Sequence, residues 1–180
     1  MRVIAGSLGG RRLKAPPGRG TRPTSERVRE ALFSMLGTVE GAGVLDLFAG
    51  TGALGIEALS RGAGRAVFVE RDAAAVRVLR ENLTALSLPA ERAQVRRGDA
   101  LAALRAARER QETYDLVFID PPYDRAEDLG PRLTELLPAL LAPSALVAVE
   151  NDRRAPLTLA LDVDRRRRYG DTSITIHRHP

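Results

Sequence analysis

Asp46-Leu47-Phe48-Ala49-Gly50-Thr51-Gly52-Ala53-Leu54-Gly55 includes the end of a predicted strand at residues 44–48 and the start of a helical stretch at residues 53–60. Its three glycines satisfy the pattern G-x-G-x-x-G directly after a strand and at the start of a helix, the context that a nucleotide-binding turn requires. Glycine lets the backbone turn tightly there and lets a ligand approach with no Cβ in the way. The stretch therefore predicts a strand–loop–helix unit at the start of an α/β sheet.

Short strands alternate with helices through most of the chain. Strands are predicted at residues 44–48, 66–70, 93–97, 114–119 and 145–150, and helices at residues 53–60, 73–86, 100–110 and 126–141. This alternation implies βαβ units, a right-handed parallel sheet and helices on both faces. Residues 157–164 and 172–178 are predicted to form an antiparallel edge hairpin, joined by a solvated turn that contains the four arginines 165–168. The predicted fold is α/β and Rossmann-like, with a mostly parallel seven-stranded sheet.

The front of the chain differs from the rest. Residues 2–13 suggest a small β-hairpin around a glycine-rich turn, residues 15–23 an extended connector, and residues 28–36 the apolar face of a helix. Residues 1–30 carry eight basic and two acidic side chains, although the whole chain has a net charge of only +5. This segment predicts a polyanionic partner. We expect an RNA-binding extension at 1–38, with its hairpin projecting outward, and a second domain at 39–180.

The composition excludes several classes of site. The 180 residues include no cysteine, so disulfides, thiolate zinc sites and a cysteine nucleophile are absent. The two histidines, His177 and His179, stand at the C-terminus, which argues against a histidine-based triad or metal site. No apolar run approaches the ~18 residues that cross a bilayer, and no N-terminal apolar segment suggests export. We expect a cytoplasmic protein.

Acidic residues follow three of the predicted strands. Glu70 ends the second strand, where an acid accepts the ribose hydroxyls of a nucleotide, so NAD or FAD binding is one reading. Asp46, four residues before Gly50, would repel a pyrophosphate but would suit a ligand with an ammonium and a sulfonium. Asp99 follows the third strand. It could accept a hydrogen bond from an adenine amine, cap the next helix at its N-terminus, or do both. These acids favour S-adenosylmethionine.

The fourth strand ends in Asp120-Pro121-Pro122-Tyr123. The two prolines stiffen the turn, and Asp120 together with the Pro121 carbonyl offers acceptors. Tyr123 adds a flat apolar face with a polar tip. Together they describe a site that stacks a planar ring and holds an exocyclic amine. The alternative is a proline-rich turn capped by a tyrosine.

These motifs resemble known families. Asp46-x-Phe48-x-Gly50-x-Gly52, Glu70, Asp99 and Asp120-Pro121-Pro122-Tyr123 resemble the class I S-adenosylmethionine methyltransferases that modify exocyclic amines. The front of the chain resembles the RsmD family of bacterial 16S ribosomal RNA guanine-N2 methyltransferases, in Met1-Arg2-Val3-Ile4-Ala5-Gly6, Arg11-Arg12-Leu13, Arg22-Pro23-Thr24 and Arg27-Val28-Arg29-Glu30-Ala31-Leu32-Phe33. The resemblance covers essentially the whole chain.

The resemblance implies a function and a set of site residues. It implies methylation of guanine N2 in 16S rRNA, within the small ribosomal subunit, using S-adenosylmethionine. A monomer is the default expectation for so small a chain, and neither a metal nor a membrane is an expected partner. The implied catalytic residues are Asp120, Pro121, Pro122 and Tyr123. The implied cofactor-binding residues are Asp46, Phe48, Ala49, Gly50, Thr51, Gly52, Glu70, Arg71, Asp99 and Ala100. The RNA-binding residues are expected to be Arg2, Arg11, Arg12, Arg19, Arg22 and Arg27.

Three other functions remain open from the sequence. A DNA or RNA adenine-N6 methyltransferase uses the same acid-Pro-Pro-aromatic motif, although 180 residues leave no room for a separate target-recognition domain. An NAD-dependent oxidoreductase is disfavoured by Asp46 and by the lack of a site for hydride chemistry. A non-catalytic RNA-binding assembly factor is the third, and the intact Asp120 motif argues against it.

Overall fold

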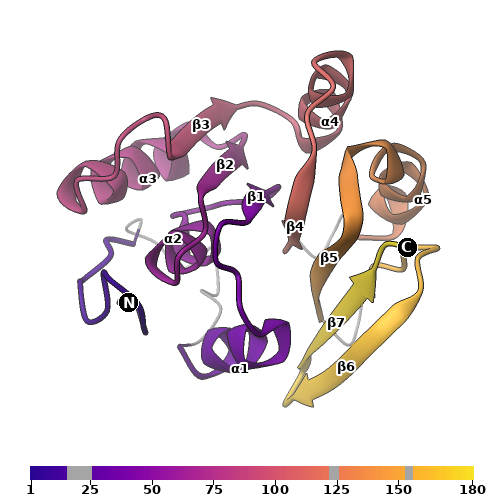
Figure 1. The fold of residues 1–180 in the computed structure, drawn as a ribbon, viewed down its shortest axis with the longest axis horizontal. Coiled ribbons are helices and arrows are strands. Elements are labelled where there is room, and N and C mark those ends of the chain that lie inside the picture. The colour runs from indigo at the N-terminus through magenta and orange to yellow at the C-terminus, as the bar shows by residue number, and fades with distance from the viewer. Residues whose placement is uncertain (16–25, 122–125, 153–155) are drawn as a thin grey trace.

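The computed structural model describes residues 1–15, 26–121, 126–152 and 156–180 and has helices on both faces of a central sheet (Figure 1). Its helices are α1 (Glu26–Leu36), α2 (Ala53–Ser60), α3 (Ala73–Ala85), α4 (Ala100–Glu109), α5 (Ala126–Leu136) and the 3₁₀ turn η2 (Pro138–Leu140). Its strands are β1 (Gly43–Asp46), β2 (Arg65–Glu70), β3 (Ala93–Arg97), β4 (Tyr114–Ile119), β5 (Leu141–Asp152), β6 (Val163–Tyr169) and β7 (Thr172–Arg178). In the described ranges, none of the helices has the length and apolar character needed to cross a membrane.

The seven strands form one sheet in the order β3-β2-β1-β4-β5-β7-β6. Strands β1 to β5 are parallel, and β7 pairs antiparallel with both β5 and β6. Helices α1, α2 and α3 share one apolar core, and α4 and α5 share the other. The central strands are apolar on both faces because helices cover both. The predicted Rossmann-like sheet with an antiparallel C-terminal hairpin is confirmed.

The helix predicted at residues 126–141 is too long. α5 ends at Leu136, the turn η2 follows, and β5 already begins at Leu141. Pro138 explains the early end, because proline lacks the N–H that would continue an α-helix and its ring clashes with the preceding turn. The strand after it is longer than predicted, because it starts four residues before residue 145 and ends two residues after residue 150.

The strand predicted at residues 157–164 is wrong. The structure places β6 at Val163–Tyr169, so the four arginines form an exposed edge strand and not a turn. The turn itself consists of Gly170 and Asp171, and the positive φ of 63° at Gly170 suits a tight hairpin. An edge strand tolerates this charge because one side of it faces water, and charged side chains hinder pairing with another chain.

The N-terminal hairpin, residues 1–13, is confirmed by an antiparallel bridge between Arg2 and Arg12. Our expectation that it projects outward is wrong, because it lies against α2 with Val3 and Leu13 buried in the core. Gly6 sits so close to α2 that a Cβ there would fall 1.8 Å from the Ser60 carbonyl oxygen, and its φ of +83° also favours glycine.

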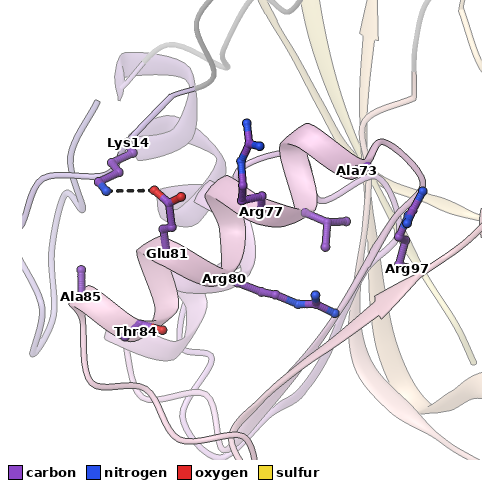
Figure 2. Close-up of a pocket in the computed structure, with 9 residues that line it drawn as sticks. Lys14, Ala73, Arg77, Arg80, Glu81, Thr84, Ala85 and Arg97 are labelled. Carbon is purple, nitrogen blue, oxygen red and sulfur yellow. Dashed lines mark hydrogen bonds and ion pairs between the residues drawn. The ribbon is translucent and has the colours of Figure 1, made fainter.

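The same segment also contacts α3. Arg11 donates through Nη2 to the Ala85 carbonyl at the end of the helix, at 2.7 Å. Lys14, directly after the hairpin, forms an exposed ion pair of 2.8 Å with Glu81 (Figure 2). The basic hairpin is therefore docked on two helices of the sheet's α1–α3 face.

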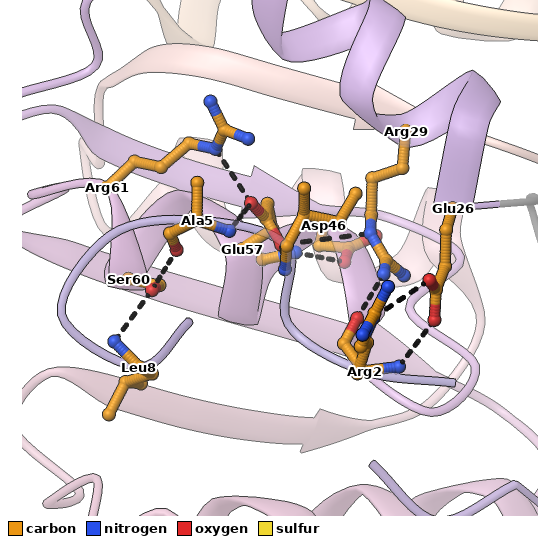
Figure 3. Close-up of polar contacts among 11 residues, drawn as sticks. Arg2, Ala5, Leu8, Glu26, Arg29, Asp46, Glu57, Ser60 and Arg61 are labelled. Atoms are coloured by element: carbon orange, nitrogen blue, oxygen red, sulfur yellow. Dashed lines mark hydrogen bonds and ion pairs between the residues drawn. The ribbon is translucent and has the colours of Figure 1, made fainter. Parts of the chain in front are cut away.

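Glu57, which is fully buried on α2, is the centre of a polar network under the hairpin (Figure 3). Its carboxylate accepts hydrogen bonds from the backbone N–H groups of Ile4 at 2.8 Å and Ala5 at 3.1 Å. Two cations flank it, Arg61 at 2.7 Å and the fully buried Arg29 at 3.8 Å. Arg29 also donates to the carbonyl of Arg2. The network joins the hairpin, α1 and α2.

Glu57→Gln should destabilise the protein strongly, because it leaves the buried Arg29 charge without its counter-ion. Loss of one partner of a buried pair costs about 3–5 kcal/mol, which urea unfolding followed by circular dichroism would measure. Hydrogen exchange at Ile4 and Ala5 should accelerate in the variant.

The matched control is Glu81→Gln, which removes a carboxylate from the exposed pair with Lys14. It should leave the free energy of unfolding nearly unchanged, because exposed pairs contribute little. Equal effects of the two substitutions would contradict the role given to Glu57.

Candidate active site

Four acidic residues follow four neighbouring strands at one edge of the sheet. Asp46 and Glu70 end β1 and β2, Asp120 directly follows β4, and Asp99 lies two residues after β3. These strands are adjacent, in the order β3-β2-β1-β4, and they run parallel. Neighbouring strands are ~4.8 Å apart, so the four acids span roughly 15 Å. The predicted gathering of these residues at the carboxyl ends of the strands is observed.

The three glycines of the loop between β1 and α2 have different structural roles. Gly50 has φ of 52° and no atom within 4 Å of the place where a Cβ would stand, so its backbone is open to a ligand. A Cβ on Gly52 would come within 2.3 Å of Leu79, and one on Gly55 within 2.3 Å of the Phe68 ring. The second and third glycines are therefore needed for close packing of α2 and α3 on the sheet.

Asp46 is a buried carboxylate with little to stabilise its charge. It is 2% exposed, and its Oδ2 accepts a hydrogen bond of 3.1 Å from the backbone N–H of Gly55. Burial above all, with a smaller contribution from the nearby Glu70 charge, raises the pKa of Asp46 to about 7 against the lowering effect of the Gly55 hydrogen bond. A ligand cation beside Asp46 would reverse this penalty, because opposite charges favour the ionised form.

Glu70 holds the backbone around the glycine loop. Its Oε2 accepts from the Gly50 N–H at 2.9 Å, and its Oε1 accepts from the Asp72 N–H at 2.8 Å. Each carboxylate oxygen has a further lone pair that could accept a hydroxyl. Glu70 thus holds in place the glycine loop that is predicted to bind the ligand.

Asp99 is the N-cap of α4. Its Oδ1 accepts from the backbone N–H groups of Leu101 at 3.0 Å and Ala102 at 3.3 Å. This capping role was one of the two readings of the sequence, and the geometry confirms it. The side chain is exposed, so the role of Asp99 toward a ligand stays a prediction. Ala100, the first helical residue, is buried.

The other predicted cofactor residues are distributed along the same edge. Phe48 is half-buried against the core under α4 and α5, and Ala49 is buried and donates its N–H to Val69 at 3.0 Å. Arg71 is exposed after β2. Thr51 is half-buried in the glycine loop, and its carbonyl is held by a residue of α3.

That residue is Asn82, which the sequence reasoning missed. It is 2% exposed, and its Nδ2 donates to the carbonyls of Thr51 at 3.0 Å and Lys14 at 3.2 Å. Its Oδ1 accepts from the Lys14 N–H at 2.8 Å. One amide therefore joins the end of the N-terminal hairpin to the glycine loop. The available signal was a polar residue on the apolar face of a helix, next to Leu79 and Leu83.

The proposed amine site is described only in part. Asp120 is half-buried and Pro121 is buried, directly after the fully buried end of β4. Pro122 and Tyr123 lie outside the described residues. The predicted pairing of an acid with the Pro121 carbonyl therefore rests on their adjacency at the end of β4.

The arginines predicted to bind RNA lie on the surface. Arg2, Arg11, Arg12 and Arg27 are exposed, whereas Arg19 and Arg22 lie outside the described residues. Arg2 forms an ion pair of 3.1 Å with Glu26, although both side chains remain accessible. Within the described ranges, no group of three or more His, Cys, Asp and Glu residues is placed to hold a metal ion.

Asp46→Asn should change how stability depends on pH. The unfolded Asp46 ionises near pH 3.9, whereas burial keeps the folded carboxyl protonated to about pH 7. The folded state then binds the extra proton, so wild-type stability falls as pH rises through this window, by up to about 1.4 kcal/mol per pH unit. The asparagine variant lacks this loss and should gain stability relative to the wild type between about pH 4 and pH 7 in urea unfolding. If the stability of the variant and the wild type depended on pH in the same way, the raised pKa of Asp46 would be contradicted. Asp171→Asn, in the exposed turn after β6, is the control.

Known proteins resemble this chain over nearly its whole length. The family model described as "Conserved hypothetical protein 95" matches residues 1–178. A "Putative rRNA methyltransferase YlbH" from Bacillus subtilis is 43% identical, over 99% of this chain and 98% of its own. A "Ribosomal RNA small subunit methyltransferase D" from Haemophilus influenzae is 38% identical, over 87% of this chain and 81% of its own.

A solved structure agrees with these relatives. The structure described as "Putative methyltransferase yhhF from Escherichia coli" superposes with a TM-score of 0.84 at 35% identity, over 99% of this chain and 97% of that one. The family match, the identities and the fold agree with the motifs at the sheet edge. The chain belongs to the family described as Conserved hypothetical protein 95, which is the RsmD family that the sequence motifs indicated.

Proposed function

We propose that this protein transfers a methyl group from S-adenosylmethionine to the exocyclic N2 amine of a guanine in 16S rRNA of the small ribosomal subunit. The names of its relatives support methylation of small-subunit ribosomal RNA. The choice of guanine N2 goes beyond those names and comes from the resemblance to the RsmD family. The motif that begins at Asp120 supports it, because that motif is suited to bind an exocyclic amine. The observation that carries the proposal is the acidic edge of the sheet, with the buried Asp46 at its centre.

The residues at this edge fit S-adenosylmethionine better than a dinucleotide. Glu70 borders the glycine loop, and a ligand with an ammonium and a sulfonium would favour the ionised form of the buried Asp46, whose pKa is otherwise raised to about 7. A pyrophosphate would be repelled by the same charges, which argues against NAD. The open backbone at Gly50 gives such a ligand room to approach.

Bound S-adenosylmethionine supplies an already activated methyl group on its sulfonium, so the protein's main task is to position the acceptor. The Asp120 carboxylate and the Pro121 carbonyl accept hydrogen bonds from the two N–H groups of the guanine amine. Because that lone pair is delocalised into the ring, these acceptors favour rehybridisation toward a nucleophile. Tyr123 stacks on the base. After transfer the amine loses one proton, either to Asp120 or to water.

The RNA approaches over the N-terminal segment. Residues 1–38 form the RNA-binding extension, and its arginines contact the phosphate backbone without reading sequence. The target guanine must leave its stack to enter the amine site, so a loop nucleotide is the expected substrate. The docked hairpin holds Arg2, Arg11 and Arg12 in place relative to the glycine loop.

Asp120→Ala should lower methyl transfer by about 10²-fold or more, while S-adenosylmethionine binding stays near the wild-type value. Asp120→Asn keeps one acceptor and should be less impaired. The control is Asp115→Asn near the start of the same strand, where Asp115 accepts the Gly43 N–H at 2.7 Å. Five residues of strand, ~16 Å, separate it from Asp120. Near-normal turnover in Asp120→Ala, measured with labelled cofactor, would refute the amine-site assignment.

The function is tested by mass spectrometry of nucleosides from 16S rRNA, after incubation of unmethylated small subunits with the protein and labelled S-adenosylmethionine. Labelled N2-methylguanosine is the expected product. Labelled N6-methyladenosine would leave the methyltransferase fold and the cofactor assignment standing but would show that the target base is adenine and not guanine. No label in subunits or in bare RNA would exclude the proposed reaction and leave the DNA methyltransferase and the non-catalytic assembly factor.

A further inference from the structure

A basic groove runs along α3 on the side of the N-terminal hairpin. Its volume is about 570 Å³, and its charged lining consists of Lys14, Arg77, Arg80, Glu81 and Arg97. In Figure 2, Arg97 lies toward the Ala73 end of the helix and Lys14 toward the Ala85 end. We call it the α3 groove.

The charge of the α3 groove is strongly unbalanced. Four cations face one acid, and that acid, Glu81, is already paired with Lys14 at 2.8 Å. Arg77, Arg80 and Arg97 are exposed, and none of them forms an ion pair with any residue in the described ranges. Arg77 and Arg80 stand three residues apart on one helix face, so their like charges repel. A bound polyanion would relieve that repulsion.

The cations come from separate segments, which suits an extended ligand. Lys14 follows the N-terminal hairpin, Arg77 and Arg80 lie on α3, and Arg97 ends β3. α3 has thirteen residues and is therefore ~20 Å long, longer than a single phosphate requires. The planar guanidinium groups match phosphate oxygens in a bidentate geometry. The groove thus offers contacts to several phosphates in succession.

The groove also leads to the candidate active site. α3 begins three residues after Glu70, and Arg97 stands two residues before Asp99. At its other end Arg11 donates to the Ala85 carbonyl, so the groove continues into the basic hairpin. A polyanion in the groove would therefore run from the N-terminal hairpin to the acidic edge of the sheet.

We propose that the α3 groove binds the phosphodiester backbone of a single-stranded segment of the RNA substrate. The inference rests on the proposed function for the identity of the polyanion. It adds Arg77, Arg80 and Arg97 to the arginines of the N-terminal extension as contacts to the RNA backbone.

The test compares Arg77→Gln/Arg80→Gln with a matched control, Arg105→Gln/Arg108→Gln. The control pair has the same spacing and exposure but lies on α4, on the opposite face of the sheet. Binding to deproteinised 16S rRNA is measured at several salt concentrations, with S-adenosylmethionine affinity and thermal unfolding as checks on the site and the fold. Loss of two phosphate contacts to a single strand should reduce the slope of log K against log salt by about 1.4. The affinity should fall about tenfold or more, while the control behaves as wild type.

Two outcomes would overturn the inference. One is the same affinity and salt slope in the groove variant and in the control. The other is weaker binding to whole small subunits with unchanged binding to bare RNA, which would assign the groove to a ribosomal protein. Methyl transfer to small subunits is assayed on the same preparations. A wild type that transfers no methyl, combined with the expected change in slope, would refute the proposed reaction and leave the groove assignment standing.

Discussion

The buried carboxylate of Glu57 is the constraint on which the arrangement of the N-terminal segment depends. An unpaired charge in this position would be very costly, so two arginines and two backbone N–H groups surround it. The groups that satisfy it come from the hairpin, from α1 and from α2. Because α2 is also the helix that follows the glycine loop, the docked extension and the candidate active site share one rigid element.

Asp46 shows the opposite solution to the same physical problem. It is almost as fully buried as Glu57, yet it accepts a hydrogen bond from the Gly55 backbone N–H and no cation flanks it within the described residues, while the nearby acid Glu70 opposes its charge. A raised pKa at a buried acid is typical of a functional site, and it is consistent with the role that we propose for Asp46 beside a cationic ligand. Glu57, in contrast, has its charge satisfied within the fold and stabilises the docked hairpin.

The sequence predicts the bounds of a helix or strand correctly where its hydrophobic periodicity and the residues that break it agree. The bounds of α2, β3, β4 and β7 match the predicted ranges, because apolar runs or alternation end there at clear breakers. The strand after residue 156 failed because an arginine run was taken for a turn, although an exposed edge strand accommodates it. The acids at the strand ends were predictable, since parallel topology alone brings them together. The glycines were also predictable as a motif, but their division between ligand access and packing depends on Leu79 and Phe68, far away in sequence.

The features that escaped prediction depend on contacts between distant segments. Asn82 is an ordinary polar residue in a helix until the fold places Lys14 on one side of its amide and Thr51 on the other. Through this amide, any displacement of the hairpin by bound RNA would act on the carbonyl of the glycine loop, and a ligand that orders the loop would act on the hairpin. Coupling between two sites must be reciprocal. The shared amide would therefore couple the proposed cofactor site to the proposed RNA-binding hairpin.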